Sequence, residues 1–122
     1  MNDFRKLMFW QKSHDLALDT YRVTEQYPAS ELYGLTSQLR RAVSSIPTNI
    51  AEGCGRDSKV ELARFVEIAS GSAFEVDYLF QLAHELGYMS DEDHKGFSEK
   101  IIEIKKMLFA YSKKVRINAK KI

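Results

Sequence analysis

Apolar side chains recur every three or four residues along four stretches of the chain, which is the period of an α-helix. These stretches are residues 9–27, 33–53, 58–87 and a fourth that begins near Ser90. No alternating run competes with this period, and no Asn-Gly or Asp-Gly hairpin signal is present. The pattern therefore predicts four helices and almost no strand.

The third stretch, residues 58–87, is the predicted core helix. Ser58 and Glu61 form a capping-box signature at its start, and Gly87 marks its end. Its apolar stripe covers nearly half of the helix circumference and includes Ile68 and Leu86, which predicts more than one packing partner. In the first stretch, the side chains predicted for the core are Phe9, Trp10, Leu16, Ala17, Tyr21, Val23 and Tyr27.

Some large apolar residues fall outside these core stripes. They are Phe74 and Tyr78 on the third stretch and Ile102 and Phe109 on the fourth. In a single bundle these side chains face outward, and Ile102 and Phe109, bordered by basic residues, are better suited to meeting another protein surface than to stacking bases.

The connections between the predicted helices are short, and short connections join antiparallel neighbours. The predicted fold is therefore all-α, an antiparallel up-down-up-down four-helix bundle. We expect residues 1–122 to form one domain, with a lead-in at 1–8 and a frayed basic tail at 118–122.

Composition limits the function without identifying it. The 122 residues are 44% hydrophobic and 29% charged, and 18 basic side chains nearly balance 17 acidic ones, so any attraction to nucleic acid must be local. The start lacks the apolar run of a signal peptide, and no stretch reaches the roughly twenty apolar residues of a membrane span. A single cysteine, Cys54, fits a reducing compartment, so we expect a cytoplasmic protein.

Basic residues gather at the end of the chain, because no acidic residue follows Glu103. Lysines suit a helix C-terminus for dipole reasons alone, so this run is either a solvated helix end or a nucleic-acid surface. The hypothetical nucleic-acid residues are Arg40, Arg56, Lys105, Lys106, Lys113, Lys114 and Arg116, while Lys120 and Lys121 extend the basic run.

The second stretch carries an unusually polar flank, made of Gln38, Arg41, Ser45, Asn49 and Glu52. Pro47 lies inside this stretch and removes a backbone donor, so neighbouring hydroxyl and amide side chains are expected to bond the freed backbone groups of a kinked helix. The flank is predicted to be a seam between helices or subunits. Arg41 could pair with Glu52 along it, and a ligand-lined seam is the alternative.

The turn Gly53-Cys54-Gly55-Arg56 allows two functional interpretations besides a structural one. A thiol near an arginine and a helix start can be reactive, and free amides at a helix start can hold an anion. A glycine C-cap that leads into the Ser58 cap explains the same residues. Neither a catalytic residue set nor a di-iron or other metal motif is found, so we expect no enzyme activity, no cofactor and no metal.

Several motifs together resemble one known family. The sequence is similar to the four-helix-bundle proteins encoded in intervening sequences of bacterial 23S ribosomal RNA genes. The motifs that carry this resemblance are Trp10-Gln11, YPASELYGL at 27–35, QLRRAVSSIPTNIAEG at 38–53, Gly55-Arg56, ASGSA at 69–73 and LGY at 86–88.

The resemblance implies a left-handed four-helix bundle, a ring-shaped homopentamer and no known enzymatic activity. A similar fold is that of the accessory variability determinant of diversity-generating retroelements, a pentamer thought to bind nucleic acid and a reverse transcriptase. The resemblance to the intervening-sequence proteins also identifies five residues with the family's polar motif: Arg41, Ser45, Asn49, Glu52 and Arg56. We interpret that motif as an interface seam rather than an active site. In the oligomer that the resemblance implies, the candidate subunit contacts are Phe74, Tyr78, Ile102 and Phe109.

Two hypotheses follow for the function. The first is a non-enzymatic oligomeric bundle that binds RNA or a ribonucleoprotein through its basic helix ends. The second is a structural or protein-interaction scaffold without nucleic-acid binding, in which the lysines only keep the surface soluble.

Overall fold

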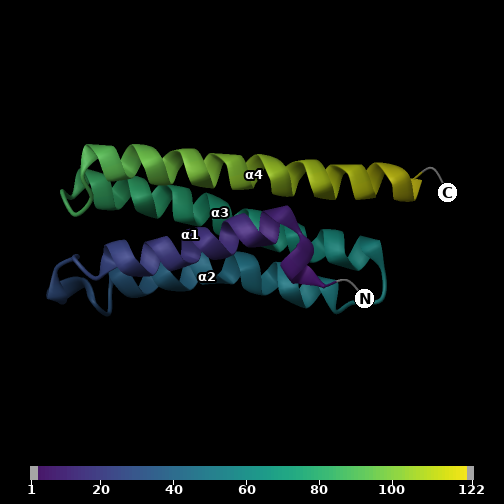
Figure 1. The fold of residues 1–122 in the computed structure, drawn as a ribbon, viewed down its shortest axis with the longest axis horizontal. Coiled ribbons are helices and arrows are strands. Elements are labelled where there is room, and N and C mark those ends of the chain that lie inside the picture. Colours follow the sequence, from purple (N-terminus) through teal and green to yellow (C-terminus); the bar gives the residue numbers. More distant parts are fainter. Residues whose placement is uncertain (1–2, 121–122) are drawn as a thin grey trace.

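The computed structural model describes residues 3–120 and folds into four long α-helices that run along one axis (Figure 1). These helices are α1 (Met8–Thr24), α2 (Leu35–Cys54), α3 (Lys59–Glu85) and α4 (Asp91–Lys120), with 3-10 helices at Phe4–Lys6 and Ala29–Glu31. Successive long helices run in opposite directions, and α3 packs against both α2 and α4. The predicted antiparallel four-helix bundle is confirmed, and residues 3–120 contain no strand.

One end of the bundle gathers the start of α1, the turn between α2 and α3, and the end of α4 (Figure 1). The other end holds the two remaining connections. This arrangement matters for the candidate site, because it brings the turn that contains Arg56 to the same end as the basic half of α4. None of the four described helices combines the length and the apolar character that a membrane crossing requires.

The helix ends follow local backbone chemistry. The Ser58 hydroxyl accepts a hydrogen bond of 3.1 Å from the Glu61 amide, so the predicted N-cap of α3 is confirmed. Gly87 has a φ of +83°, a left-handed conformation that suits glycine, and it ends the third helix as predicted. Ser90 caps α4 by accepting a bond of 3.1 Å from the Asp93 amide.

Helix α4 extends to Lys120, so the helix continues past Asn118, where we expected fraying. Part of the expected lead-in at 1–8 is ordered, because a 3-10 helix occupies Phe4–Lys6. Residues 1, 2, 121 and 122, and with them Lys121 of the basic run, lie outside the described residues.

The core contains large side chains from all four long helices, with Phe80 of α3 the largest that is fully buried. Three residues predicted for the core are instead exposed: Ile68 by 44%, Leu86 by 50% and Tyr21 by 44%. Trp10 is only half-buried. The apolar arc of a helix can be wider than the strip its neighbours cover, and these residues lie at or beyond the edges of that strip.

Small hydroxyl residues take the place of aromatic ones on the buried side of α1. Ser13, Thr20 and Thr24 are buried. Each hydroxyl donates to a carbonyl of its own helix: Thr20 to Leu16 at 2.7 Å, Thr24 to Thr20 at 2.8 Å, and Ser13 to Trp10 at 2.9 Å. Because these donors are satisfied internally, α1 can pack closely against the bundle without leaving unpaired polar groups.

Helix α2 passes through Pro47, which is buried, without a break in the helix. The side chains of Ser44, Ser45, Thr48 and Asn49 each donate to a carbonyl three or four residues earlier, at 2.8 to 3.2 Å. The predicted side chains therefore bond the backbone around the proline, but their acceptors are the carbonyls of Arg41, Ala42, Ser44 and Ser45, and none of the four bonds the Val43 carbonyl that Pro47 frees. Burial of the proline ring also offsets part of the cost of the lost backbone donor.

Candidate functional site

The outer face of α4 carries a stripe in which lysines alternate with apolar side chains. Ile102, Lys106, Phe109 and Lys113 follow one another at intervals of three or four residues, so they lie on one side of the helix. Phe109 is 64% exposed, and the Lys113 ammonium lies 5.8 Å from the centre of its ring. This α4 stripe presents cations and apolar surface together.

Two cations of the predicted nucleic-acid set are held by acids of α3. Arg116 donates to both carboxylate oxygens of Glu67, at 2.9 and 3.2 Å. This hydrogen bonding lowers the pKa of Glu67, against a smaller opposing effect of burial. Lys105 lies 2.6 Å from Asp77 and 4.2 Å from the centre of the Phe74 ring. Both cations are therefore partly neutralised by partners from their own chain.

The two predicted arginines outside α4 lie at different ends of the bundle. Arg40 is near the α1–α2 connection, where it donates to the Thr24 hydroxyl at 2.8 Å and to the Tyr21 carbonyl at 3.1 Å. Arg56 is in the α2–α3 turn, with its guanidinium 4.8 Å from the centre of the Phe65 ring. The structure therefore places Arg56 at the basic end of the bundle, and it does not bring Arg40 together with the other predicted cations.

The polar flank of α2 lies along α3 and is bonded to it at two points. The Ser45 and Ser72 hydroxyls are 2.5 Å apart, and the Gln38 amide donates to Glu75 at 3.4 Å. Asn49 bonds the backbone of its own helix. These contacts support the prediction of an interhelical seam.

Arg41 and Glu52 do not pair, contrary to the suggested alternative. They lie eleven residues apart on one helix, which separates them by about 16 Å along the axis. Both side chains are exposed. They are therefore available to groups outside this chain.

A surface of exposed aromatic residues extends from α3 to the α4 stripe. Phe74 is 63% exposed and Tyr78 60%, and Ile102 on α4 is 42% exposed. Lys105 connects the two helices here through its contacts with Asp77 and Phe74. All four residues that the sequence proposed as oligomer contacts are therefore exposed on α3 and α4, and we call this set the outer aromatic face: Phe74, Tyr78, Ile102 and Phe109.

The turn between α2 and α3 has a structural explanation. A Cβ atom on Gly53 would lie 2.7 Å from the Leu62 side chain and 2.8 Å from Phe65 Cβ, so glycine allows α2 to approach α3. Gly53 lies within α2, and Gly55 caps the helix at a φ of −83°, so neither uses a left-handed glycine cap. The predicted glycine C-cap of α2 is therefore confirmed at Gly55, which holds a right-handed backbone conformation.

Cys54 is buried, and burial raises the pKa of its thiol, with a smaller contribution from the charge of Asp3. A raised pKa keeps the thiol protonated and unreactive. The structural interpretation of this cysteine is therefore better supported than a reactive one.

Histidine and acidic side chains come together at the other end of the bundle. The His84 and His94 rings are stacked with centres 4.2 Å apart, and His84 Nε2 lies 2.6 Å from an oxygen of Asp91. Within residues 3–120, no group of three or more histidine, cysteine or acidic residues has a geometry that could hold a metal ion.

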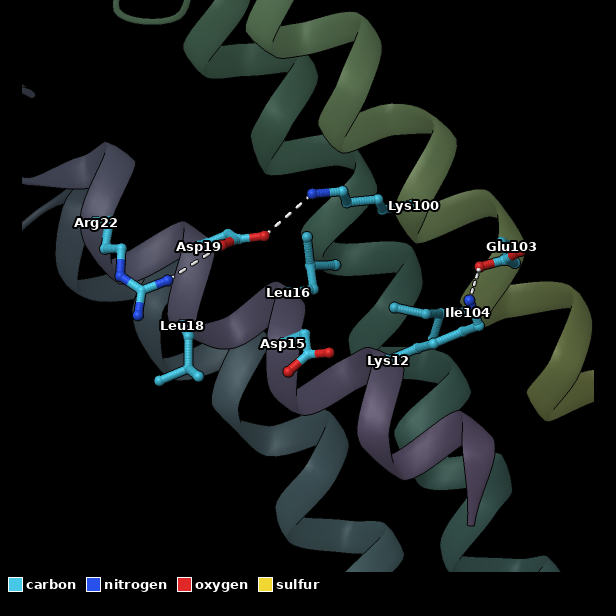
Figure 2. A pocket seen from close by; sticks show the side chains of 9 residues that line it. All are labelled: Lys12, Asp15, Leu16, Leu18, Asp19, Arg22, Lys100, Glu103 and Ile104. Carbon is cyan, nitrogen blue, oxygen red and sulfur yellow. Dashed lines mark hydrogen bonds and ion pairs between the residues drawn. The ribbon is translucent and has the colours of Figure 1, made fainter. Parts of the chain in front are cut away.

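The groove between α1 and α4 has a volume of about 350 Å³ and is bordered by charges of both signs (Figure 2). Lys12 pairs with Glu103 at 2.9 Å, and Asp19 pairs with Lys100 at 3.1 Å and Arg22 at 3.3 Å. Because its cations are paired with acids, this groove offers little attraction for a polyanion. In the α4 stripe, by contrast, the lysines lie beside exposed apolar side chains.

Two features were not found from sequence. Tyr27 is 7% exposed and its hydroxyl lacks a hydrogen-bond partner within the described residues. Burial, and to a smaller extent the charge of Asp93, raises its pKa to about 12.

The second feature is an exposed aromatic row on α1. The sequence pattern had assigned two of its residues, Trp10 and Tyr21, to the core. The helical spacing of Ser13 and Thr20 was the signal that could have revealed this row. These small residues mark the buried side of α1, which differs from the side that carries Trp10 and Tyr21.

Comparisons with known proteins agree with this fold. Residues 5–110 match the model of the 23S rRNA-intervening sequence protein family. A crystal structure of a protein of unknown function from the S23 ribosomal protein family of Bacteroides thetaiotaomicron VPI-5482 has a TM-score of 0.78 and 23% identity. The similarity covers 87% of this chain and 99% of that chain, and at this identity it concerns the fold. No curated protein is a significant match. The family match spans most of the chain, so this protein belongs to the 23S rRNA-intervening sequence protein family.

Proposed function

We propose that the chain is a non-enzymatic bundle that assembles with further copies of itself and binds RNA or a ribonucleoprotein through exposed lysines of α4. The observation that carries this proposal is the α4 stripe, where Lys106 and Lys113 alternate with exposed apolar side chains. The ring of five copies implied by the family resemblance is the assembly we expect. The free thiol of Cys54 suits the reducing cytoplasm, where we place its action.

Self-assembly is supported by the outer aromatic face. Exposed aromatic residues are typical of the centre of protein interfaces, and polar and charged residues typically surround them. Gly71 adds a second argument, because it is exposed in the middle of α3 and a Cβ there would meet no atom within 4 Å. Glycine costs about 1 kcal/mol relative to alanine inside a helix, and here no contact within the chain requires it. It leaves room for a helix of a second copy.

Replacing Phe109 with aspartate is expected to weaken self-association at least about 30-fold, the factor that corresponds to losing an interface hot spot of about 2 kcal/mol. A charge there would be desolvated in the interface. Light scattering coupled to size-exclusion chromatography measures the mass of the assembly over a protein concentration series. Circular dichroism should remain unchanged, because Phe109 is 64% exposed in the single chain.

Tyr33→Asp is the matched control, because Tyr33 is 94% exposed and lies outside the outer aromatic face. It should leave the assembly unchanged. A wild-type chain that stays monomeric at all micromolar concentrations would rule out self-assembly, and an equal effect of both substitutions would remove the outer aromatic face as its site.

RNA binding is supported by the lysines that acids of the chain leave available. Lys106, Lys113 and Lys114 are exposed, whereas Lys105 and Arg116 are paired with acids of α3. Exposed ammonium groups on one half of a helix can contact successive phosphates and release their counterions. The α2–α3 turn, which contains Arg56, lies at the same end of the bundle as the end of α4 and adds a fourth cation (Figure 1).

Changing Lys106, Lys113 and Lys114 together to glutamine is expected to weaken RNA binding and its salt dependence. The slope of log affinity against log salt should become shallower by about 0.7 for each lost phosphate contact, and thus by about 2. Fluorescence anisotropy of a labelled single-stranded RNA, titrated between about 50 and 200 mM salt, measures both quantities.

The matched control is the triple change of Lys12, Arg22 and Lys100 to glutamine, in the α1–α4 groove of Figure 2. It removes the same three charges, but from residues that are paired with acids. If both triple variants lost the same RNA affinity, the binding would depend on the net charge of the protein rather than on the α4 lysines. Absence of binding at low salt would contradict the RNA part of the proposal.

The alternative is a protein-interaction scaffold without nucleic-acid binding. The ion pairs of Arg116 with Glu67 and of Lys105 with Asp77 favour it, because they reduce the positive potential at the basic end. The two experiments separate these functions: a scaffold retains the assembly of copies and does not bind RNA at low salt.

A further inference from the structure

A groove between α1 and α2 lies away from both surfaces considered so far. It has a volume of about 420 Å³. Its walls carry Trp10, His14 and Tyr21 of α1, and its floor includes Ala17 and Pro47. Tyr21 is 44% exposed and the Trp10 and His14 rings are half-buried, so these rings are partly open to solvent. Three rings in one line on a helix form an unusual surface for a closed bundle.

The first two rings form the start of a stack. The Trp10 and His14 rings have centres 4.8 Å apart and planes only 11° from parallel, and Phe4 packs on Trp10 with a centre distance of 4.8 Å. Trp10 and His14 are separated by about 6 Å along the helix, so the stack runs roughly in the direction of α1. The next ring in this direction belongs to Tyr21.

The gap between His14 and Tyr21 has a suitable length for planar rings. Seven residues separate the two positions, which is about 10.5 Å along the helix axis. Stacked rings repeat at about 3.4 Å, the spacing of successive bases in nucleic acid, so two planar rings fill a gap of this length. Ala17 and the flat ring of Pro47 lie at the bottom of the groove between the two aromatic residues, and Leu18, which is 41% exposed, also lines it, so bases in the gap would pack against this side chain as well.

Polar groups beside this gap favour rings that carry N–H donors. The Ser44 hydroxyl donates to the Arg41 carbonyl and the Thr48 hydroxyl to the Ser44 carbonyl, at 3.2 and 2.8 Å. With their protons used in this way, both hydroxyl oxygens face a ligand only as acceptors. Nucleobases with exocyclic amino groups combine a planar ring with such donors.

Charge at the ends of the groove suits the phosphates that accompany bases. The Arg40 guanidinium lies 4.9 Å from the centre of the Tyr21 ring, and that of Arg5 lies 4.4 Å from the centre of the Phe4 ring. None of the described residues that line the groove is acidic. A chain of nucleotides could therefore place bases in the groove and a phosphate near Arg40, whereas Arg5 is already paired with Asp3 at 3.4 Å and attracts a phosphate less.

We propose that the groove between α1 and α2 binds nucleobases, stacked between His14 and Tyr21 and packed against Leu18. Free nucleotides and single-stranded RNA present the same planar ring, and the experiment below distinguishes them. This site is independent of the RNA contact proposed for α4, because it recognises the base rather than the phosphate and lies on other helices.

Trp10 provides a nearby signal, because it is the single tryptophan of the chain and its ring stacks on His14, which the first base would contact. Titration with adenosine, which carries no charge, is expected to quench its fluorescence with little dependence on salt. Adenylate and a short oligoadenylate should quench at lower concentrations. If the oligoadenylate binds more tightly than adenylate, single-stranded RNA is the source of the bases, and if adenylate binds as tightly, free nucleotides are.

His14→Ala is expected to weaken adenosine binding about tenfold, the effect of losing one stack between a base and an aromatic ring. His94→Ala is the matched control, because His94 belongs to the other stacked histidine pair at the far end of the bundle and should not change the titration. Circular dichroism confirms that each variant is folded.

The proposal fails if adenosine leaves Trp10 fluorescence unchanged up to its solubility limit, or if His14→Ala and His94→Ala behave alike. It also fails if quenching occurs only with oligoadenylate and disappears in the Lys106, Lys113 and Lys114 triple variant. That last result would support the RNA contact on α4 while excluding a base site in the groove.

Discussion

Phe80→Ala is expected to lower the free energy of unfolding by about 3 to 5 kcal/mol, close to the whole stability of many domains of this size. Phe80 is 0% exposed, and it is the largest fully buried side chain. Its ring packs on Phe97 of α4 with centres 5.2 Å apart. Alanine would remove this contact and leave a cavity where α3 meets α4, because both helices are held by further buried residues and cannot close the space.

Urea unfolding followed by circular dichroism measures this loss at a fixed protein concentration, which is needed because assembly would add to stability. Tyr33→Ala makes the same change of an aromatic residue to alanine at a side chain that is 94% exposed. It should alter the free energy of unfolding by less than about 0.5 kcal/mol. A loss below about 1 kcal/mol for Phe80→Ala would contradict the described position of this ring in the core.

The four helices could be predicted from sequence because their signals are local. The caps at Ser58 and Gly87 each depend on residues within a few positions, and the apolar period extends over whole helices. The exposed positions of Phe74 and Phe109 followed from the same period, because both fall outside the apolar stripes. The family resemblance led to the same fold independently, and the match of residues 5–110 to the family model confirms the resemblance.

The availability of individual cations could not be predicted in this way. Arg116 is held by Glu67, which is 49 residues earlier in the chain, and Lys105 by Asp77, which is 28 residues earlier. Such pairs depend on how far one helix is rotated and shifted against the next. A sequence pattern identifies which side chains share a helix face, but it does not specify which acid that face meets.

The groove between α1 and α2 was missed for a related reason. Trp10 and Tyr21 fit an apolar arc on α1, and hydrophobic character alone places them inside. In the structure, the buried side of α1 is rotated toward Ser13 and Thr20, whose hydroxyls bond their own helix. Self-satisfied hydroxyls behave as small core residues, and this allows the aromatic row to remain at the surface, where it can take part in binding.

Gly53→Val is expected to lower the free energy of unfolding by about 3 kcal/mol, the upper end of the usual cost of overpacking a core. A Cβ there would lie 2.8 Å from Phe65 Cβ and 3.4 Å from the backbone at Leu62 Cα, so rotation of a side chain cannot relieve the overlap. Valine adds two further methyl groups in the same space. The α2 and α3 helices must therefore separate near their connecting turn, or the end of α2 must unwind.

Separation of these helices would also disturb the seam, because the contact of 2.5 Å between the Ser45 and Ser72 hydroxyls requires α2 and α3 to remain close. Urea unfolding measures the stability, and hydrogen exchange of the α2 and α3 amides shows whether the change spreads from the turn to the seam.

Gly96→Val is the matched control, because a Cβ on Gly96 would meet no atom within 4 Å. This substitution should change the free energy of unfolding by less than about 1 kcal/mol. If both valine substitutions had equally small effects, the close approach at Gly53 would not be what sets the distance between α2 and α3. If Gly53→Val reduced stability and left exchange along the seam unchanged, the strain would be confined to the turn, and the seam would be held by its own contacts.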